Sequence, residues 1–592
     1  SPPVVSARTE RARRRARDLH TAVTAAATIS PVEIASIIST CLLVKDGQKH
    51  TLSVPDVLLA HQASSAVSID VHSDLPIIQG VDPWLVPIPS TARAALRGPH
   101  ADLWNRAMQR ELQSIRTRGT WIEAILPRSV NGKVIRPIAA KWVFNVKGNG
   151  LFKARLCARG DQRPDTPDEP DSNSPTAQRH SVNLLLALAR ARGWHVHCMD
   201  VDTAYLYGDI PESVAGTVWM SLFEGLHPEI TAPPGETIAL NLLHTLYGLR
   251  FAGRQWWFRM HKYLLSIGFS VNPADPCVYH KRVDGDLVTL CLYVDDLLIF
   301  CANMDVLTAC KRELSTQFAM KDLGPVTQYL GISIIQTDDS IALHCAQYIE
   351  KLAALYAPHD PIAVLSPVRN ISGRPARISK SQCPVINSDE YIVMKQYPYA
   401  ALVGSLLYIA TNVRPDIARI TQSLSRYIAN PAHDHWLAAL HVLQYLRSTP
   451  TLGPRFTDIE VPGSSLKLSA YVDASFAPDW SDNDGISITG FLIYLGTAPV
   501  GWVSRSQKLV AGSTCESEYV ALMDLINNLE WFNCFLQNVD CPQGVISVYE
   551  DNQAVISLAN NISFRNTTRH MVVRHVRVRT AIEENLIKLH YI

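Results

Sequence analysis

The sequence predicts an α+β protein of several domains, and three observations support this expectation. The chain has 592 residues, which is too long for a single hydrophobic core and indicates about three or four domains. Residues 287–302 (LVTLCLYVDDLLIFCA) form two apolar runs of strand composition around an acidic pair. From about Leu466 onward, the predicted elements follow the order βββαβα, which is typical of a mixed α/β domain.

The overall composition is that of a globular protein, with 47% hydrophobic and 18% charged residues. The net charge of +1 shows no basic bias, so any nucleic-acid-binding surface has to be local. The 12 cysteines include no Cys-x-x-Cys pair. This pattern argues against a zinc module and for reduced thiols in an intracellular protein.

Residues 1–95 show no sustained hydrophobic period and are predicted to be a poorly specified leader. A basic run at 10–17 (ERARRRAR) precedes a mildly apolar stretch at 21–44, which Pro31 and Glu33 interrupt. Because of these interruptions, we expect neither a membrane span nor a cleaved signal peptide. A solvated helix face explains the basic run better than a nuclear-targeting or nucleic-acid-binding patch.

A helix and a basic strand pair are predicted after the leader. Apolar residues recur at helical spacing in ADLWNRAMQRELQSIRTRGTW, where Gly119 marks the stop. Two strand-like pieces follow, AAKWVFNVKG and LFKARLCARG, and the second alternates apolar residues with Lys153, Arg155 and Arg159. This ribbon could bind the phosphates of a triphosphate or of a template, or it could be a solvated hairpin. Its own residues do not favour one interpretation over the other.

The acidic pair Asp295–Asp296 predicts a metal site. Two adjacent carboxylates in an otherwise buried segment cost free energy through desolvation and repulsion, so a cation has to compensate them. Hard oxygen ligands favour Mg²⁺. Substrate phosphates and water molecules usually complete the coordination shell of this ion. That is the chemistry of nucleotidyl transfer. The alternative is an ordinary hairpin with an Asp-Asp turn.

A third carboxylate for this site is expected in the upstream strand WHVHCMDVDTAYLYGDI. Asp200 and Asp202 lie two residues apart and are predicted to share one face of that strand. His195, His197 and Cys198 have near-ligand spacing, but side chains one and two apart on a strand do not converge well. A core or edge histidine is therefore favoured over a zinc site.

The chain from about Pro358 to Tyr397 is rich in Pro, Ser and Arg, which predicts a linker. Three helices of a bundle or connection are expected after it: YAALVGSLLYIATN, IARITQSLSRYIAN and HDHWLAALHVLQYLRST.

The last domain carries acidic residues at the ends of its predicted elements. Asp473 closes the first strand, Glu516 and Glu518 open the long helix, and Asp551 ends the fourth strand. Together these positions predict a second metal site. Singly, the glutamates could favour a helix N-terminus and Asp551 could be a cap.

These motifs resemble, in the same order, the polymerase and ribonuclease H region of copia-type (Pseudoviridae) retrotransposon polyproteins. The similar segments include FKARLCARG, MDVDTAYLYGD, LYGLRFAGRQWW, LYVDDLLI, LVGSLLYIATNVRPDI, YVDAS, ESEYVAL and EDNQAV. The resemblance implies a right-hand polymerase with fingers, palm and thumb at 96–356. A linker with connection helices at 357–464 and a ribonuclease H-like α/β domain at 465–592 would follow.

The resemblance also implies roles for the palm residues. Asp200, Asp295 and Asp296 resemble the carboxylates that hold two Mg²⁺ ions, or Mn²⁺ in their place. One ion would lower the pKa of the primer 3′-hydroxyl, and the other would clamp the triphosphate and the leaving pyrophosphate. Tyr205 resembles the aromatic steric gate that excludes a ribose 2′-hydroxyl.

Four further residues resemble substrate contacts of the family. Lys153 and Arg155 match the fingers residues that touch the incoming triphosphate, and Tyr293 and Val294 would lie beside the primer terminus.

In the last domain, Asp473, Glu518 and Asp551 resemble the metal ligands of ribonuclease H, which cleaves the RNA strand of a hybrid. Glu518 is preferred to Glu516 because Glu-Tyr-Val-Ala-Leu resembles the family helix, in which the catalytic glutamate begins Glu-x-x-Ala. Recognition of the hybrid would depend on shape and 2′-hydroxyl contacts.

The sequence departs from the family pattern at several positions. Phe251 stands where the family has a nucleotide-positioning Gln, and Gly253 stands where it has Pro. An acidic residue is usual where Val572 stands, and a glutamate is usual near Thr580. The chain reaches Ile592 before the family's Ala-Asp-containing helix, so a C-terminally short ribonuclease H domain of less certain activity is expected.

An RNA-directed DNA polymerase with associated ribonuclease H is the leading hypothesis. Its partners would be an RNA template, a DNA primer and product, an RNA–DNA hybrid and dNTPs, without a membrane, in a cytoplasmic particle or the nucleus. The alternative is a degenerate or repurposed retroelement protein that binds nucleic acid without catalysis. A template-directed RNA polymerase is disfavoured by Tyr205. Integrase and protease motifs are absent, which favours a polyprotein fragment or a decayed remnant.

Overall fold

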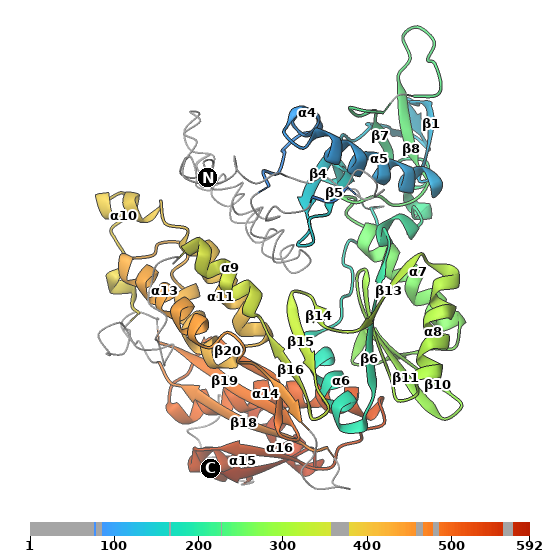
Figure 1. Cartoon of the computed structure of the whole chain (residues 1–592). Helices are drawn as coiled ribbons and strands as arrows, with labels where there is room; N and C mark the ends of the chain where they lie inside the picture. The colour runs from blue at the N-terminus through green and yellow to red at the C-terminus, as the bar shows by residue number, and fades with distance from the viewer. Residues whose placement is uncertain are drawn as a thin grey trace.

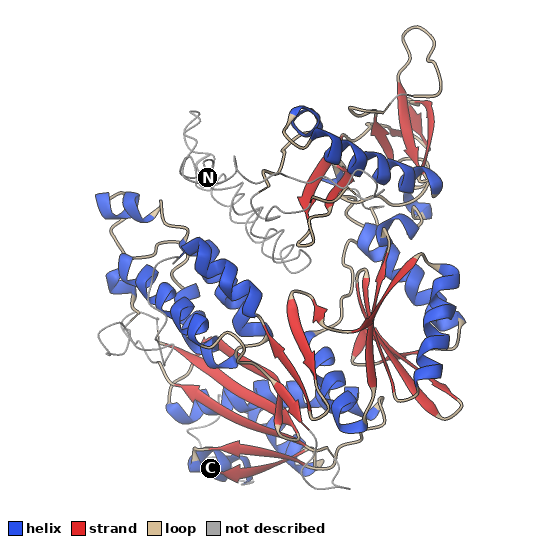
Figure 2. Cartoon of the chain, viewed as in Figure 1, coloured by secondary structure: helices blue, strands red, loops and turns tan. Residues whose placement is uncertain are grey.

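The computed structural model describes residues 76–78, 86–164, 167, 169–226, 228–356, 378–457, 466–477, 485–560 and 572–592. Most of the predicted leader, and residues 357–377 of the predicted linker, lie outside them. Figures 1 and 2 show the described elements as a series of sheets with helices packed on them. The protein is therefore of the predicted α+β multidomain class, while the exact domain boundaries stay predictions.

The first described unit packs helix α5 (Ala101–Thr117) on the hairpin of β4 (Ala140–Val146) and β5 (Phe152–Ala158). Trp104 of α5 contacts Phe144 and Phe152 edge-on, with ring centroids 5.1 and 4.4 Å away. Its other elements are α4 (Ala92–Arg97), the pair β2 (Ser129–Val130) and β3 (Lys133–Val134), and a sheet of β1 (Trp121–Ile125), β8 (Ile238–Leu242) and β7 (Trp219–Ser221). The predicted helix and both basic-ribbon strands are confirmed.

A 6-stranded sheet, here called the central sheet, has the strand order β13-β6-β12-β11-β10-β9. The strands are β6 (His195–Val201), β9 (Ser270–Asn272), β10 (Asp275–Val283), β11 (Asp286–Tyr293), β12 (Asp296–Cys301) and β13 (Met320–Pro325). Figure 1 shows α6 (Arg179–Arg192) on one side of it and α7 (Ala252–Ser266) and α8 (Met304–Gln317) on the other. Between their ends, strands β11 and β12 are apolar except for the buried Thr289, as expected for a sheet covered on both faces.

The next unit joins a small sheet to a helical bundle. Its strands are β14 (Gln328–Tyr329), β15 (Ile332–Gln336), β16 (Ser340–His344) and β17 (Arg455–Thr457), and its helices are α9 (Ala346–Tyr356), α10 (Asp389–Met394), α11 (Tyr399–Asn412), α12 (Ala418–Ser425) and α13 (His433–Ser448). The three predicted bundle helices are confirmed. The predicted linker is partly wrong, because α10, with its Ser388 cap, lies inside it. That helix is only 6 residues long, too short to show a period in the sequence.

The last domain is a 5-stranded sheet in the order β20-β19-β18-β21-β22. Its elements are β18 (Leu468–Ser475), β19 (Ile486–Leu495), β20 (Ala498–Val510), α14 (Thr514–Gln537), β21 (Ile546–Glu550), α15 (Gln553–Asn560), α16 (Val572–Glu583) and β22 (Ile587–Tyr591). The predicted βββαβα order is confirmed. Helix α16 and strand β22, which pairs in parallel with β21, were not predicted.

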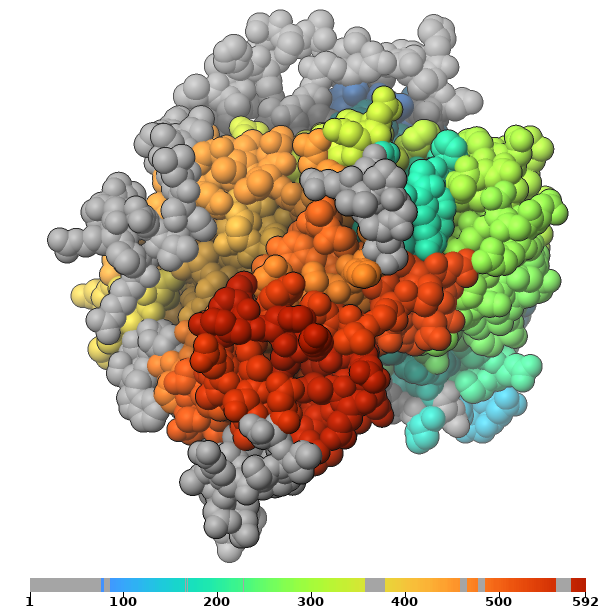
Figure 3. All heavy atoms as spheres, turned by 90° about the horizontal axis from the view of Figure 1, so that it is seen from below, coloured from blue at the N-terminus to red at the C-terminus, as the bar shows by residue number. Residues whose placement is uncertain are grey.

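The last domain packs directly against the central sheet and α6. Figure 3 shows its orange and red residues in contact with the green residues of the central unit. Asn183 of α6 donates to the Val500 carbonyl at 3.2 Å, and Trp531 of α14 donates to the Ala274 carbonyl at 2.6 Å. None of the described helices is long and apolar enough to cross a membrane, and the described cysteines are free thiols.

His180 makes this interface sensitive to acid. Its ring lies 5.4 Å from Phe532 and 6.2 Å from Trp531, and burial, reinforced by Arg179, lowers the pKa of His180 to about 4. Between pH 6.5 and 4 the unfolded chain thus binds more protons at this residue than the folded protein, so the free energy of unfolding falls on acidification. The loss at this residue is at most about 3 kcal/mol, and less where water reaches the half-buried ring.

We therefore expect His180→Phe to lose less stability than the wild type between pH 7 and pH 4.5. Urea unfolding at both pH values measures the difference. Equal losses in the two proteins would contradict a role for His180 in the acid sensitivity.

Two candidate metal centres

The first candidate centre is built on the hairpin between β11 and β12. Tyr293 pairs with Asp296, so Val294 and Asp295 form a two-residue turn. Val294 has a φ of 54°, a left-handed conformation that is strained for a β-branched residue. Trp256 of α7 donates to the Val294 carbonyl at 2.6 Å. The predicted tight hairpin is confirmed, and this hydrogen bond helps to hold its strained turn.

Asp200 joins the acidic pair from the neighbouring strand. It lies directly opposite Asp296 in the register of β6 and β12, and Val201 donates to the Asp295 carbonyl at 2.8 Å. Burial and then Asp295 and Asp200 raise the pKa of Asp296 to about 7. Burial and then Asp295 also raise the pKa of Asp200. The charges of this group therefore oppose the ionisation of Asp200 and Asp296, and a divalent cation would relieve this effect.

Asp202 does not belong to this group, and the prediction that it shares a strand face with Asp200 is wrong. Strand β6 ends at Val201, and the chain turns at Thr203, whose φ is 55°. Asp202 is exposed in this turn. The prediction assumed that the strand continues through the motif, and no Gly or Pro in the sequence signals the turn.

The neighbouring histidine is a core residue, as expected. Lys311 of α8 donates to His197 Nδ1 at 2.6 Å and to Asp322 at 2.7 Å. This arrangement occupies His197 in a hydrogen-bond chain and gives no zinc site there.

Cations of the β4–β5 hairpin face the palm carboxylates. Burial, Arg155 and Lys147 lower the pKa of Lys153 to about 8, and Asp295 opposes this effect. Lys147 and Lys153 in turn favour the ionised form of Asp200. Lys147 directly follows β4, at the end of the hairpin. It was not predicted from the sequence as a site residue, although its position next to the basic strand β5 could have indicated this role. The charge pattern favours the phosphate-holding interpretation of the ribbon.

Arg159, the third cation of the predicted ribbon, is not part of this group. It is exposed and pairs with Asp161 at 2.7 Å.

Tyr205 lies beyond the carboxylates, in a 3₁₀ turn (Ala204–Tyr207) that follows β6. Its ring is half-buried and meets the ring of Tyr247 edge-on, with centroids 5.2 Å apart. Tyr293 lies at the end of β11, where burial raises its pKa. Each of these positions is compatible with the substrate contact that the resemblance implies.

Phe251 does not project into this site. Its side chain is fully buried in the core of the first unit, one residue before α7 begins. The resemblance implies a Gln at this position. The Phe that stands here does not occupy the space of the site, because its side chain lies in the core.

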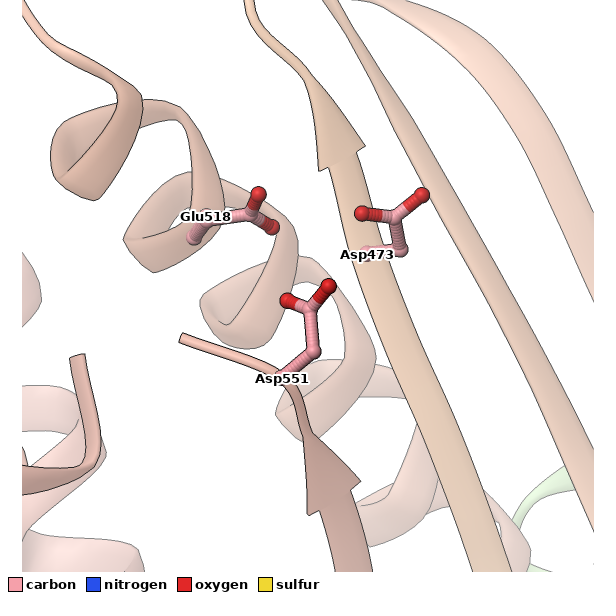
Figure 4. Close-up of side chains that lie close together, drawn as sticks. All are labelled: Asp473, Glu518 and Asp551. Carbon is pink, nitrogen blue, oxygen red and sulfur yellow. The ribbon is translucent and has the colours of Figure 1, made fainter. Parts of the chain in front are cut away.

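The second candidate centre unites Asp473 of β18, Glu518 of α14 and Asp551, which follows β21. Their ligand atoms all lie within 4.8 Å of one another, and Figure 4 shows the three carboxylates converging. Among the described residues, no other group of three acidic, His or Cys side chains comes this close together. The palm carboxylates Asp200, Asp295 and Asp296 therefore lie farther apart than the three carboxylates of this centre. The convergence arises because β18 and β21 are parallel neighbours with Val472 opposite Glu550, which puts both aspartates at the same edge.

The electrostatics of this centre also favour a cation. Burial and then Glu550, Asp473 and Asp551 raise the pKa of Glu518 to about 8. Glu518 is 4% exposed, and its Oε2 has no hydrogen-bond partner. A buried carboxylate oxygen without a partner, aimed at two other carboxylates, fits a divalent cation with oxygen ligands.

Glu550 is a fourth buried acid beside this centre, and sequence reasoning missed it. Burial raises its pKa to about 7, and its Oε1 accepts from the Asn552 backbone at 3.1 Å. Glu516 instead accepts from the Gly512 backbone at 2.8 Å, a helix-terminal role. The geometry thus favours Glu518 over Glu516 as the ligand.

The two residues expected to be acidic near the C-terminus both fall on α16. Val572 begins this helix, and its side chain is not described; Thr580 lies in its last turns and is half-buried.

Comparisons with known proteins identify the region that contains the first centre. Residues 128–368 match the family model "Reverse transcriptase (RNA-dependent DNA polymerase)". The Pol polyprotein from transposon TNT 1-94 of Nicotiana tabacum is 33% identical over 509 residues, which cover 85% of this chain and 36% of the relative. The Pol polyprotein from transposon RE2 of Arabidopsis thaliana is 27% identical over 514 residues, which cover 84% of this chain and 33% of the relative.

The chain spans about a third of the length of these relatives. Among solved structures, a foamy viral protease-reverse transcriptase in complex with double-stranded DNA aligns with a TM-score of 0.45 and 13% identity, over 82% of this chain and 69% of that one. The family match and the two transposon relatives confirm the resemblance to copia-type retrotransposon polyproteins: residues 128–368 form the reverse transcriptase domain of a transposon polyprotein.

Proposed function

We propose that the chain synthesises DNA on an RNA template and cleaves the RNA strand of the resulting hybrid, with Mg²⁺ or Mn²⁺ at each centre. The observation that carries the polymerase proposal is the alignment of Asp200 opposite Asp296, beside Asp295 at the turn, within the field of Lys147 and Lys153. Such a set of carboxylates and cations suits phosphoryl transfer, which depends on positioning and charge neutralisation.

In the proposed reaction, each group of the polymerase site has one task. Asp200, Asp295 and Asp296 would hold the divalent cations, and the bound ions would supply positive charge that favours ionisation of the attacking hydroxyl and neutralises the triphosphate. Lys153 and Arg155 bind the triphosphate from the β5 side. Tyr205 excludes a ribose 2′-hydroxyl, and Tyr293 and Val294 contact the primer terminus.

The second centre would hydrolyse RNA. Asp473, Glu518 and Asp551 would bind the cations, which would supply the charge needed to activate a water molecule for hydrolysis of the phosphodiester. The direct packing of this domain on α6 and the central sheet supports a shared path for one hybrid. The proposed partners are thus an RNA template, a DNA primer, dNTPs and the RNA–DNA hybrid.

The test is extension of a DNA primer on an RNA template with Mg²⁺ and dNTPs. Incorporation that stops when EDTA removes the metal supports the proposal. Salt-dependent binding of the hybrid without incorporation would instead indicate the non-catalytic alternative. The buried position of Phe251 weakens one motive for that alternative, because the substitution does not block the site.

Tyr205→Ala is expected to relax sugar discrimination. Without the ring, a ribonucleotide meets less steric exclusion, so the ratio of kcat/KM for dNTP to that for rNTP should fall roughly tenfold or more. Tyr205→Phe keeps the ring and should keep the ratio. Single-nucleotide incorporation with both nucleotide types measures it, and an unchanged ratio in Tyr205→Ala would contradict the gate assignment.

A further inference from the structure

Tyr247 lies between the gate and a cation of the proposed triphosphate site. Its ring meets Tyr205 edge-on at 5.2 Å with an interplanar angle of 73°, and the Arg155 guanidinium lies over the same ring, 5.6 Å from its centroid. Burial raises the pKa of Tyr247 far above its usual range. The side chain is therefore a neutral aromatic group, enclosed between two residues with proposed substrate contacts.

The backbone fixes Tyr247 against strand β5. The Tyr247 carbonyl accepts from Ala158 at 2.7 Å. The next residue, Gly248, has a φ of 87°, and a Cβ there would lie 2.1 Å from the Ala158 carbonyl oxygen. Only glycine permits this close approach, so the turn places the Tyr247 ring at a fixed distance from the strand that carries Arg155.

A second set of contacts fixes the same turn to the gate. The Thr245 hydroxyl donates to the Tyr205 carbonyl, and the Thr245 backbone donates to the Gly208 carbonyl at 2.8 Å. Hydrogen bonds thus link the gate turn to the Tyr247 turn, and link the Tyr247 turn to the end of β5.

Gly253 of α7 packs beside the gate. A Cβ at this position would lie 3.6 Å from Tyr205 Cε1 and 3.2 Å from Ser174 Cβ. The second distance is shorter than an ordinary van der Waals contact, so the surroundings of the gate ring are closely packed here. The edge-on contact with Tyr247 is therefore part of a tightly packed environment around the Tyr205 ring.

We propose that Tyr247 is a positioning residue that sets the sugar selectivity of the polymerase by holding the Tyr205 ring in its excluding orientation. The inference rests on the proposed polymerase function. An edge-to-face contact restricts the rotation of the gate ring about its own side-chain bonds. Without this contact, the ring can turn away from its excluding orientation and admit a 2′-hydroxyl.

The experiment measures single-nucleotide incorporation by the full chain with dNTP and rNTP. Tyr247→Leu keeps apolar volume but removes the ring, and we expect the dNTP/rNTP ratio of kcat/KM to fall about three- to tenfold. Tyr247→Phe keeps the edge-on ring and should retain the wild-type ratio. The change should come from faster rNTP incorporation, which a general loss of folding would not produce.

Tyr207→Phe is the matched control. Tyr207 lies two residues from the gate, but its ring packs on Phe318 at 5.1 Å and Trp256 at 5.8 Å. It should leave the sugar ratio unchanged even if it lowers stability. If the wild type is active and Tyr247→Leu has an unchanged dNTP/rNTP ratio, the positioning role of Tyr247 would be overturned. The proposed polymerase function would not be affected by that result. A wild type that incorporates neither nucleotide would instead reject the proposed function.

Discussion

Asp295→Asn is expected to abolish DNA synthesis while leaving the protein folded. Asp295 lies at the turn of the β11–β12 hairpin, and its charge raises the pKa values of both Asp200 and Asp296. Removing it would weaken cation binding at the proposed polymerase site, so primer extension should fall roughly a thousandfold or more. Because the substitution also removes repulsion between buried carboxylates, the metal-free variant should be at least as stable as the wild type.

Two measurements separate these effects. Primer extension in Mg²⁺ reports the loss of activity, and thermal unfolding in EDTA reports the stability of the variant. Asp202→Asn is the matched control, since Asp202 is exposed in the turn after β6 and should retain extension. Extension that survives in Asp295→Asn, or is lost equally in Asp202→Asn, would contradict the assignment of the site.

Local patterns were enough to predict the elements that carry the two groups of carboxylates. The helical spacing before Gly119 and the apolar runs around Asp295 each specify one element, and both lie where expected. The short helix α10 and the end of β6 before Asp202 were not predictable in this way. Both depend on tertiary contacts, since β6 ends where the chain turns at Thr203 and meets the segment before β13.

The composition of each site was less predictable than its location. Glu550 reads in the sequence as an ordinary strand residue, and only the pairing of β21 with β18 places it beside Glu518. Phe251 reads as a loss in the nucleotide site, whereas its side chain is part of the core. Lys147 acts on Asp200 through space from another sheet. Such long-range contacts leave no periodic signal in the chain.

Glu518→Gln is expected to eliminate RNA cleavage while leaving primer extension intact. Glu518 supplies the buried carboxylate oxygen without a partner in the second centre, so its loss should lower hydrolysis of an RNA–DNA hybrid roughly a thousandfold. The polymerase carboxylates lie on a different sheet, so extension should stay within about twofold of the wild type. Parallel assays on one labelled hybrid measure both activities.

The same variant should change how stability depends on pH and metal. The pKa of Glu518 is raised to about 8 from 4.5, so the folded protein binds more protons than the unfolded chain between these values, and the metal-free wild type loses stability as pH rises. Glu518→Gln should lose less between pH 5 and pH 8, and should gain less from Mg²⁺ at pH 8. Glu516→Gln, which alters the side chain that accepts from the Gly512 backbone, should follow the wild type in both respects. If Glu516→Gln rather than Glu518→Gln lost cleavage and the Mg²⁺ response, the ligand at this centre would be Glu516, and the convergence of Asp473, Glu518 and Asp551 would be structural.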